Sequence, residues 1–135
     1  MDVETRDLIR KRAGDRCEYC HMPQVATPFI SFHVEHIVAR QHRDVPSDDP
    51  SELAYACDRC NAFKGPNLSS IDPTTGDKVD LFNPRLHDWS EHFGLSAGRI
   101  IGLTPIGRAT VRLLNMNAAR RVELRHHWSE EGGSF

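Results

Sequence analysis

The chain has 135 residues, of which 39% are hydrophobic, and a formal net charge of −2. The length fits one compact domain, and the charge excludes a globally basic protein, so a polyanionic partner would have to bind a local patch. No apolar run approaches the roughly 20 residues of a membrane-spanning helix, and the charged N-terminus lacks the apolar region of a signal peptide. We therefore expect a cytoplasmic protein, in which cysteines bind metals or catalyse more often than they form disulfides.

The first half of the chain predicts an α+β arrangement. Apolar residues at helical spacing indicate helices, and runs of β-branched and aromatic residues indicate strands. Glycine and proline mark where these elements end. In chain order, we expect a helix over residues 5–13 that ends at Gly14, a strand over 29–38, a loop over 40–51, a second strand over 53–56, and a helix that ends at Gly65.

The second half predicts short strands followed by two helices. Thr104 followed by Pro105 is typical of a helix N-cap and first helical position. We expect turns and short strands over 67–103 with Trp89, His92 and Phe93 packed on the core, helices over 105–115 and 117–128, and a frayed tail from Ser129 to Phe135. The extension over about 104–128 is expected to belong to the same domain, 1–135.

All four cysteines fall in two CxxC pairs, Cys17 with Cys20 and Cys57 with Cys60. One CxxC turn brings two thiolates together, and two such turns complete a tetrahedral shell around zinc. The segment between the pairs, residues 21–56, has room for a β-hairpin. Two disulfides or four unrelated buried thiols are the alternatives. Because a Cys₄ shell leaves no open coordination position, we expect this zinc to be structural.

Three residues near the hairpin could carry chemistry: Glu35, His36 and Asn61. A carboxylate and an amide oxygen suit a hard cation such as Mg²⁺ or Mn²⁺, and a neutral His suits a general base for water. Adjacent strand residues point to opposite faces, so Glu35 and His36 line one site only at a strand end or bulge. Together they predict metal-assisted phosphodiester hydrolysis, although a lone strand His is more often a packing residue. His33, on the face of Glu35, is a weaker candidate.

A longer pattern joins the cysteine pairs to these residues. It reads Cys17-x-x-Cys20, Val34-Glu35-His36-Ile37-Val38 and Leu53-Ala54-Tyr55-Ala56-Cys57-x-x-Cys60-Asn61-x-x-Lys64-Gly65. This string resembles the HNH endonucleases, and especially their zinc-bearing branch, which includes phage resolvases. The resemblance covers residues 17–65 and implies an α+β fold with a small zinc-stapled ββα-metal core, also called a His-Me finger, and flanking helices. The downstream strings DPTTG, LFNPR, DWSEHF and TPIGRATVRLLNMN resemble the tail of a bacterial HNH subgroup.

The resemblance implies a role for each matching residue. His36 stands at the general-base position, Glu35 at the first metal ligand, and Asn61 at the second. Glu52 takes the place of the middle Asn of the HNH name, which braces the hairpin loop and orients the base. An ionised Glu cannot donate a hydrogen bond as Asn does, so Glu52 could weaken the brace. It could instead accept from the imidazole N–H of His36 and raise the basicity of that imidazole. Both interpretations stay open. The implied products carry 5′-phosphate and 3′-hydroxyl ends.

Basic residues near this pattern are candidates for phosphate contacts. Lys64 lies on the expected metal-site helix, and Arg40 and Arg43 lie in the loop. Solvated surface charge is the alternative for each. A further set could form a basic face along DNA, although such runs are usually helix exteriors: Arg10, Lys11, Arg12, Arg16, Arg120, Arg121 and Arg125.

The sequence therefore favours a metal-dependent endonuclease that acts on duplex or branched DNA, as a possible homodimer. A non-catalytic zinc module that binds nucleic acid or protein is the main alternative, which Glu52 and the acidic net charge favour. A zinc-ribbon transcription or assembly factor is a third, but it leaves Glu35, His36 and Asn61 unexplained. The biological role does not follow from the scaffold.

Overall fold

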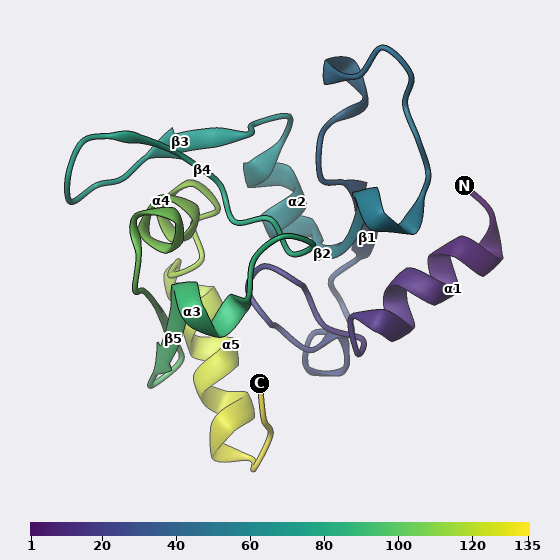
Figure 1. Cartoon of the computed structure of the whole chain (residues 1–135). Coiled ribbons are helices and arrows are strands. Elements are labelled where there is room, and N and C mark those ends of the chain that lie inside the picture. The colour runs from purple at the N-terminus through teal and green to yellow at the C-terminus, as the bar shows by residue number, and fades with distance from the viewer.

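The chain is a mixed α+β structure whose strands form three separate two-stranded antiparallel sheets (Figure 1). The computed structural model describes all 135 residues. Its helices and strands are α1 (Val3–Arg12), β1 (Phe32–His36), β2 (Leu53–Cys57), α2 (Asp58–Lys64), β3 (Ser69–Ile71), β4 (Lys78–Asp80), α3 (Trp89–His92), β5 (Phe93–Ser96), β6 (Arg99–Gly102), α4 (Pro105–Leu113) and α5 (Ala119–Glu130). The predicted α+β class is confirmed.

Strands β1 and β2 and helix α2 follow one another as a ββα unit. The register pairs Glu35 with Ala54 and His36 with Leu53. β1 is shorter than the expected strand over 29–38, because the amide of Ile30 bonds back to Thr27 and curls the chain before the strand begins. The loop over 37–52 extends away from the unit as an arch that contains two 3₁₀ turns (Figure 1).

The β2 strand is buried along its whole length because both of its faces are covered. Leu53 and Tyr55 pack with Ile9 of α1 in a small apolar cluster, and Ala54 and Ala56 join the main core. Asp2 caps the N-terminus of α1, where its carboxylate accepts from the Thr5 amide at 2.7 Å. The helix ends at Gly14, as expected, where φ is +67°.

The main core joins the two halves of the chain around the four cysteines. Its fourteen buried residues are Cys17, Tyr19, Cys20, Met22, Ile37, Ala54, Ala56, Cys57, Cys60, Phe82, Phe93, Ile100, Leu114 and Met116. Trp89 packs against this cluster, and the His92 imidazole bonds to the hydroxyl of Thr104 at 2.6 Å. The expected inward packing of Trp89, His92 and Phe93 is confirmed.

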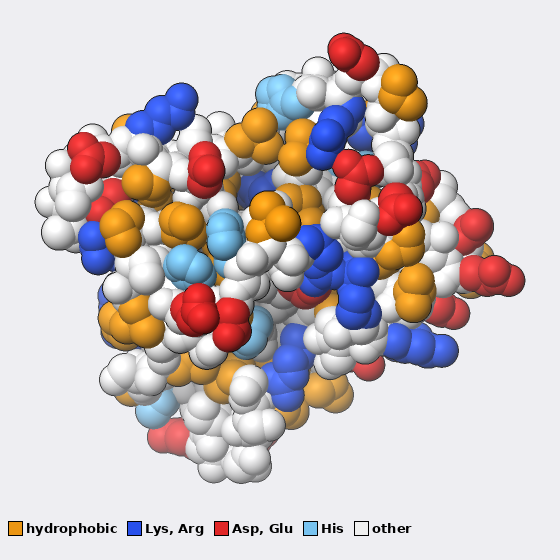
Figure 2. Space-filling model, viewed as in Figure 1, with side chains coloured by type: hydrophobic (Ala, Val, Ile, Leu, Met, Phe, Trp, Pro, Cys, Tyr) orange, Lys and Arg blue, Asp and Glu red, His pale blue; other side chains and the backbone are white.

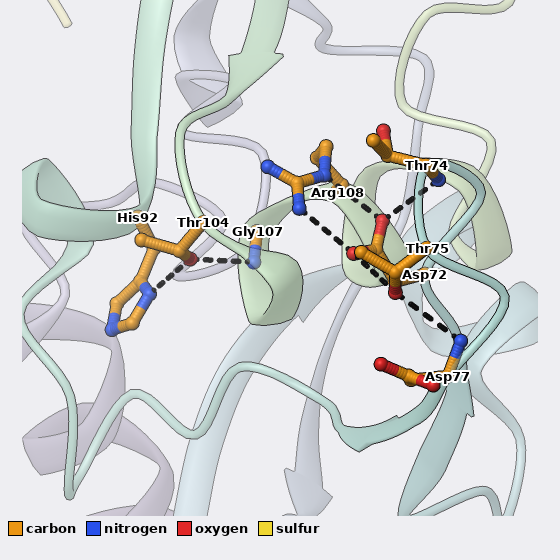
Figure 3. A network of polar contacts seen from close by, with 8 residues as sticks. All are labelled: Asp72, Thr74, Thr75, Asp77, His92, Thr104, Gly107 and Arg108. Atoms are coloured by element: carbon orange, nitrogen blue, oxygen red, sulfur yellow. Dashed lines mark hydrogen bonds and ion pairs between the residues drawn. The ribbon is translucent and has the colours of Figure 1, made fainter.

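An ion pair holds the β3–β4 hairpin against α4 (Figure 3). Asp72 is fully buried, and its two carboxylate oxygens accept from the Arg108 guanidinium at 2.9 and 2.8 Å. Thr104 caps α4 by accepting from the Gly107 amide at 3.0 Å, and Pro105 is the first helical residue, as expected. A Cβ at Gly107 would overlap the carbonyl oxygen of His92, so this close approach requires glycine.

The C-terminal residues lie against the N-terminal half. Arg16 and Trp128 both donate to the carbonyl of Ser134, at 2.5 and 3.0 Å, so the structure corrects the expectation of a frayed tail. These two contacts explain the difference, because they supply the tail with hydrogen-bond partners that the sequence alone did not reveal. No helix combines the length and the apolarity that crossing a membrane requires.

Candidate metal and nuclease site

The four cysteine thiols converge in the core. Their sulfur atoms all lie within 4.8 Å of one another, and those of Cys20 and Cys57 are 3.8 Å apart. Ligands about 2.3 Å from a tetrahedral zinc lie about 3.8 Å from one another, so the cluster could hold zinc. Burial raises the pKa of the Cys17 and Cys60 thiols well above the usual range, whereas hydrogen bonds from the other three cysteines lower the pKa of Cys20. Four thiolates here therefore need compensating positive charge, which a dication supplies.

A guanidinium from the C-terminal helix adds to that positive charge. Arg121 of α5 is 7% exposed, and its Nη2 donates to the sulfur of Cys60 at 2.8 Å. Its Nη1 donates to the carbonyls of Leu114 and Asn115 at 2.6 and 3.0 Å. Burial lowers the pKa of Arg121, but the surrounding cysteines outweigh burial and raise it overall, so the guanidinium stays charged.

The Glu35 carboxylate lies between β1 and α2 in a buried polar cluster. It is 7% exposed, and one oxygen accepts from the Tyr19 hydroxyl. The other accepts from the Lys64 ammonium at 3.3 Å, and the same ammonium donates to the carbonyl of Ile37 at 2.8 Å. Burial raises the pKa of Glu35, and the Lys64 charge and the Tyr19 hydrogen bond only partly offset that rise.

The His36 side chain leaves β1 on the opposite face from Glu35. His36 pairs with Leu53, whose side chain packs towards α1, whereas Glu35 pairs with Ala54. The imidazole Nε2 lies 2.8 Å from a carboxylate oxygen of Asp48 in the 37–52 loop, and this contact lowers the pKa of Asp48. Since His36 is the last residue of β1, its imidazole reaches the loop at the strand's open end.

Glu52 contacts the loop and does not contact His36. Its carboxylate pairs with Arg43 at 2.9 Å, so it ties the end of the loop to the middle. Asp48, and not Glu52, is the group that contacts the His36 imidazole. The amide of Ile37 bonds to the Glu52 carbonyl at 3.0 Å and closes the base of the loop.

Asn61 lies on α2 one turn before Lys64, and residues at this spacing share a helix face. Its side chain is half-buried and makes no hydrogen bond to the rest of the chain. The Glu35 carboxylate and the Asn61 amide are thus oxygen donors on the β1 and α2 elements of one ββα unit. They have the chemistry that a hard cation requires, although Glu35 is already engaged by Lys64.

Residues 17–66 match the family model of the HNH endonucleases. The match spans both cysteine pairs and the whole ββα unit, so the resemblance predicted from the sequence is confirmed over this segment. It suggests nuclease activity in general. No curated protein and no solved structure matches the chain.

The basic residues around the HNH segment differ in their availability to DNA. Arg40 is well exposed, with its nearest carboxylate, Asp48, 4.0 Å away, and Arg43 is partly exposed but paired with Glu52. Lys64 was expected at the surface, but its side chain is buried with Glu35, which corrects that expectation. The expected basic face is also incomplete, because Arg121 and Arg125 are buried. Basic and acidic side chains are interspersed on the face shown in Figure 2.

A cleft of about 220 Å³ opens beside the HNH segment, between the end of α2 and the segment that follows β4. Ile37, Val38 and Lys64 form its wall on the HNH side. Asp80 and His87 line the other side, and Asp80 makes no ion pair. The cleft therefore adjoins the buried Glu35–Lys64 pair.

Two site residues, Tyr19 and Asp48, were not identified from the sequence, and Arg121 was considered only for a basic face along DNA and not as a partner of the cysteines. Tyr19 lies inside the first CxxC, where a bulky aromatic residue could have indicated an inward contact. Asp48 lies in an acidic stretch of the loop without a motif, and Arg121 lies in a helical run that resembles an exterior. Nothing local distinguishes Asp48 or Arg121 from solvated charges.

Proposed function

We propose that the chain is a metal-dependent DNA endonuclease with a structural zinc in the Cys₄ cluster. The observation that carries the proposal is the pairing of His36 with Asp48 at the end of β1, one residue after Glu35 in the sequence and inside the HNH match. Its substrate would be duplex or branched DNA, and its products would carry 5′-phosphate and 3′-hydroxyl ends. A homodimer would place one site on each strand of a duplex, and we expect the protein in the cytoplasm.

His36 would serve as the general base through its Nδ1 atom. An ionised Asp48 only accepts, so Nε2–H donates to its oxygen and leaves the Nδ1 lone pair free. That lone pair can take a proton from a water molecule as its oxygen attacks phosphorus. The paired carboxylate also stabilises the imidazolium that results.

Glu35 and Asn61 would hold the catalytic cation, Mg²⁺ or Mn²⁺. When bound, such a cation polarises a phosphate oxygen and stabilises charge on the leaving oxygen. Arg40 is exposed at the start of the loop and would bind a neighbouring phosphate, with Arg43 beside it. Glu52 would keep the loop closed, so that Asp48 stays within reach of His36.

Plasmid cleavage tests the proposal directly. Zinc-loaded wild type should cut supercoiled plasmid when Mg²⁺ or Mn²⁺ is added and should not cut it in EDTA. The cleavage rate of His36→Ala should be at least about 100-fold lower, because a general base usually contributes at least this much. His33→Ala is the matched control, because His33 is exposed on the same strand. This variant should cleave plasmid at the wild-type rate. Cleavage by His36→Ala at the wild-type rate would remove His36 as the base.

A non-catalytic zinc module is the second candidate. It is favoured by the engagement of both Glu35 oxygens, one with the Tyr19 hydroxyl and the other with the Lys64 ammonium, because these contacts compete with a cation. This candidate predicts DNA or protein binding with full zinc occupancy and no strand cleavage in any divalent cation. The same plasmid assay, paired with a gel-shift measurement, separates the two functions.

A further inference from the structure

The Lys64 side chain is an unusual neighbour for a metal ligand. It is 2% exposed, and its ammonium lies 3.3 Å from the Glu35 oxygen that the Tyr19 hydroxyl does not contact. A lysine is almost never fully buried unless it is paired, and the contacts to Glu35 and the Ile37 carbonyl supply that pairing. Lys64 therefore occupies the position next to Glu35 from which a cation would bind.

An ammonium and a divalent cation cannot both occupy this position. Mg²⁺ binds carboxylate oxygen at about 2.0–2.1 Å with nearly ideal octahedral geometry, so an ammonium held beside the same oxygen competes with the cation for that site. Two positive groups at such a separation also repel each other strongly in a buried site. The proposed use of Glu35 as a metal ligand thus requires Lys64 to move.

We infer that the Lys64 ammonium holds the cation position at Glu35 and is displaced into the adjoining cleft when a divalent cation binds. This inference rests on the proposed function, because it concerns the same metal site. The exchange keeps the buried carboxylate paired with a positive charge in both states. Without such a charge, ionised Glu35 would be buried alone, which is strongly unfavourable.

The cleft provides a place for the displaced side chain. Lys64 already forms part of its wall, so rotation about the side-chain bonds would carry the ammonium into it. Across the cleft, Asp80 is exposed and has no ion-pair partner, so it can accept the ammonium.

Chemical labelling of the wild-type, zinc-loaded protein tests the inference. The chain has three lysines, and Lys11 and Lys78 are exposed, so they serve as internal controls. Under reductive methylation read by peptide mass spectrometry, Lys64 should react at least about tenfold more slowly than the controls. Saturating Mn²⁺, monitored by electron paramagnetic resonance, should raise the Lys64 rate towards theirs. Unchanged protection of Lys64 at saturating Mn²⁺ would overturn the inference.

Variants give an independent measurement. Lys64→Met should bind Mn²⁺ at least about tenfold more tightly than wild type, because the competing ammonium is gone. Lys78→Met is the matched control and should bind as wild type does, and Glu35→Gln should lose binding. Zinc content and circular dichroism establish that each variant is folded. Equal Mn²⁺ affinity in folded Lys64→Met and wild type would contradict the exchange.

The outcomes separate this inference from the proposed function. Release of Lys64 by Mn²⁺ in a protein that cleaves no DNA would support the exchange and remove the nuclease. Glu35-dependent cleavage with Lys64 still protected would overturn the exchange and keep the nuclease. No Mn²⁺ binding by wild type or Lys64→Met would overturn both.

Discussion

Replacing Arg121 with Met should weaken zinc binding. Met retains an unbranched apolar stem but removes the guanidinium that donates to the Cys60 sulfur at 2.8 Å. Four thiolates around one dication leave a net charge of about −2 in the core. Without Arg121, that buried charge loses its closest positive neighbour on α5.

The expected magnitude follows from the contacts that disappear. Groups that hydrogen-bond to metal ligands typically change metal affinity by about 10–100-fold, which corresponds to about 1.4–2.7 kcal/mol. The carbonyls of Leu114 and Asn115 also lose their donor, and a buried acceptor without a partner costs about 1–3 kcal/mol. We therefore expect the zinc dissociation constant to rise about 10–100-fold, together with a lower free energy of unfolding.

Competition with a chromophoric chelator measures the zinc affinity directly. Arg120→Met is the matched control, because Arg120 is the adjacent residue, its side chain is 64% exposed, and its ion pair with Glu123 is 3.5 Å long. Its zinc affinity should stay within about twofold of wild type, since exposed ion pairs contribute little. An Arg121→Met protein that holds zinc as tightly as Arg120→Met would refute the reasoning that Arg121 compensates the thiolate charge.

Two further perturbations test other contacts. The Arg108 guanidinium holds the pKa of Asp72 well below its usual range, so this carboxylate stabilises the fold above about pH 4 and loses that effect as the pH falls. In urea melts at pH 7, Asp72→Asn should therefore have a lower free energy of unfolding than wild type, and this difference should shrink below about pH 4. A difference that stays constant with pH would show that the ionised Asp72 carboxylate does not stabilise the fold. Asp48→Asn should slow plasmid cleavage roughly tenfold, as expected for a residue that orients the base, and Asp44→Asn in the same loop should not. Equal rates for the two variants would show that Asp48 does not orient His36.

The sequence was most informative where local chemistry decides the structure. The CxxC pairs predicted the cysteine cluster because each turn fixes two thiols within four residues. Thr104 and Pro105 predicted the start of α4 because capping depends on neighbours along the chain. The register that sets Glu35 and His36 on opposite faces also follows from strand alternation.

Contacts between distant segments were not predictable in the same way. The residues around Lys64 are equally consistent with a surface lysine, and its burial depends on Glu35, 29 positions earlier. Asp48 reaches His36 because the 37–52 loop folds back, which no residue preference specifies. Arg121 contacts Cys60 across 61 positions, and only the packing of α5 on the core brings them together.

The residues after the HNH match have a physical role in the candidate site. Trp89 donates from its indole to the carbonyl of Tyr19 at 2.8 Å and stacks on His21, with ring centroids 3.9 Å apart. These contacts hold the first CxxC turn, whose Tyr19 hydroxyl donates to Glu35. From the other side, Arg121 holds the second cysteine pair, and the helix that begins there carries Lys64. Both partners of the Glu35 carboxylate thus depend on segments beyond residue 66, so the geometry of the site is a property of the whole chain.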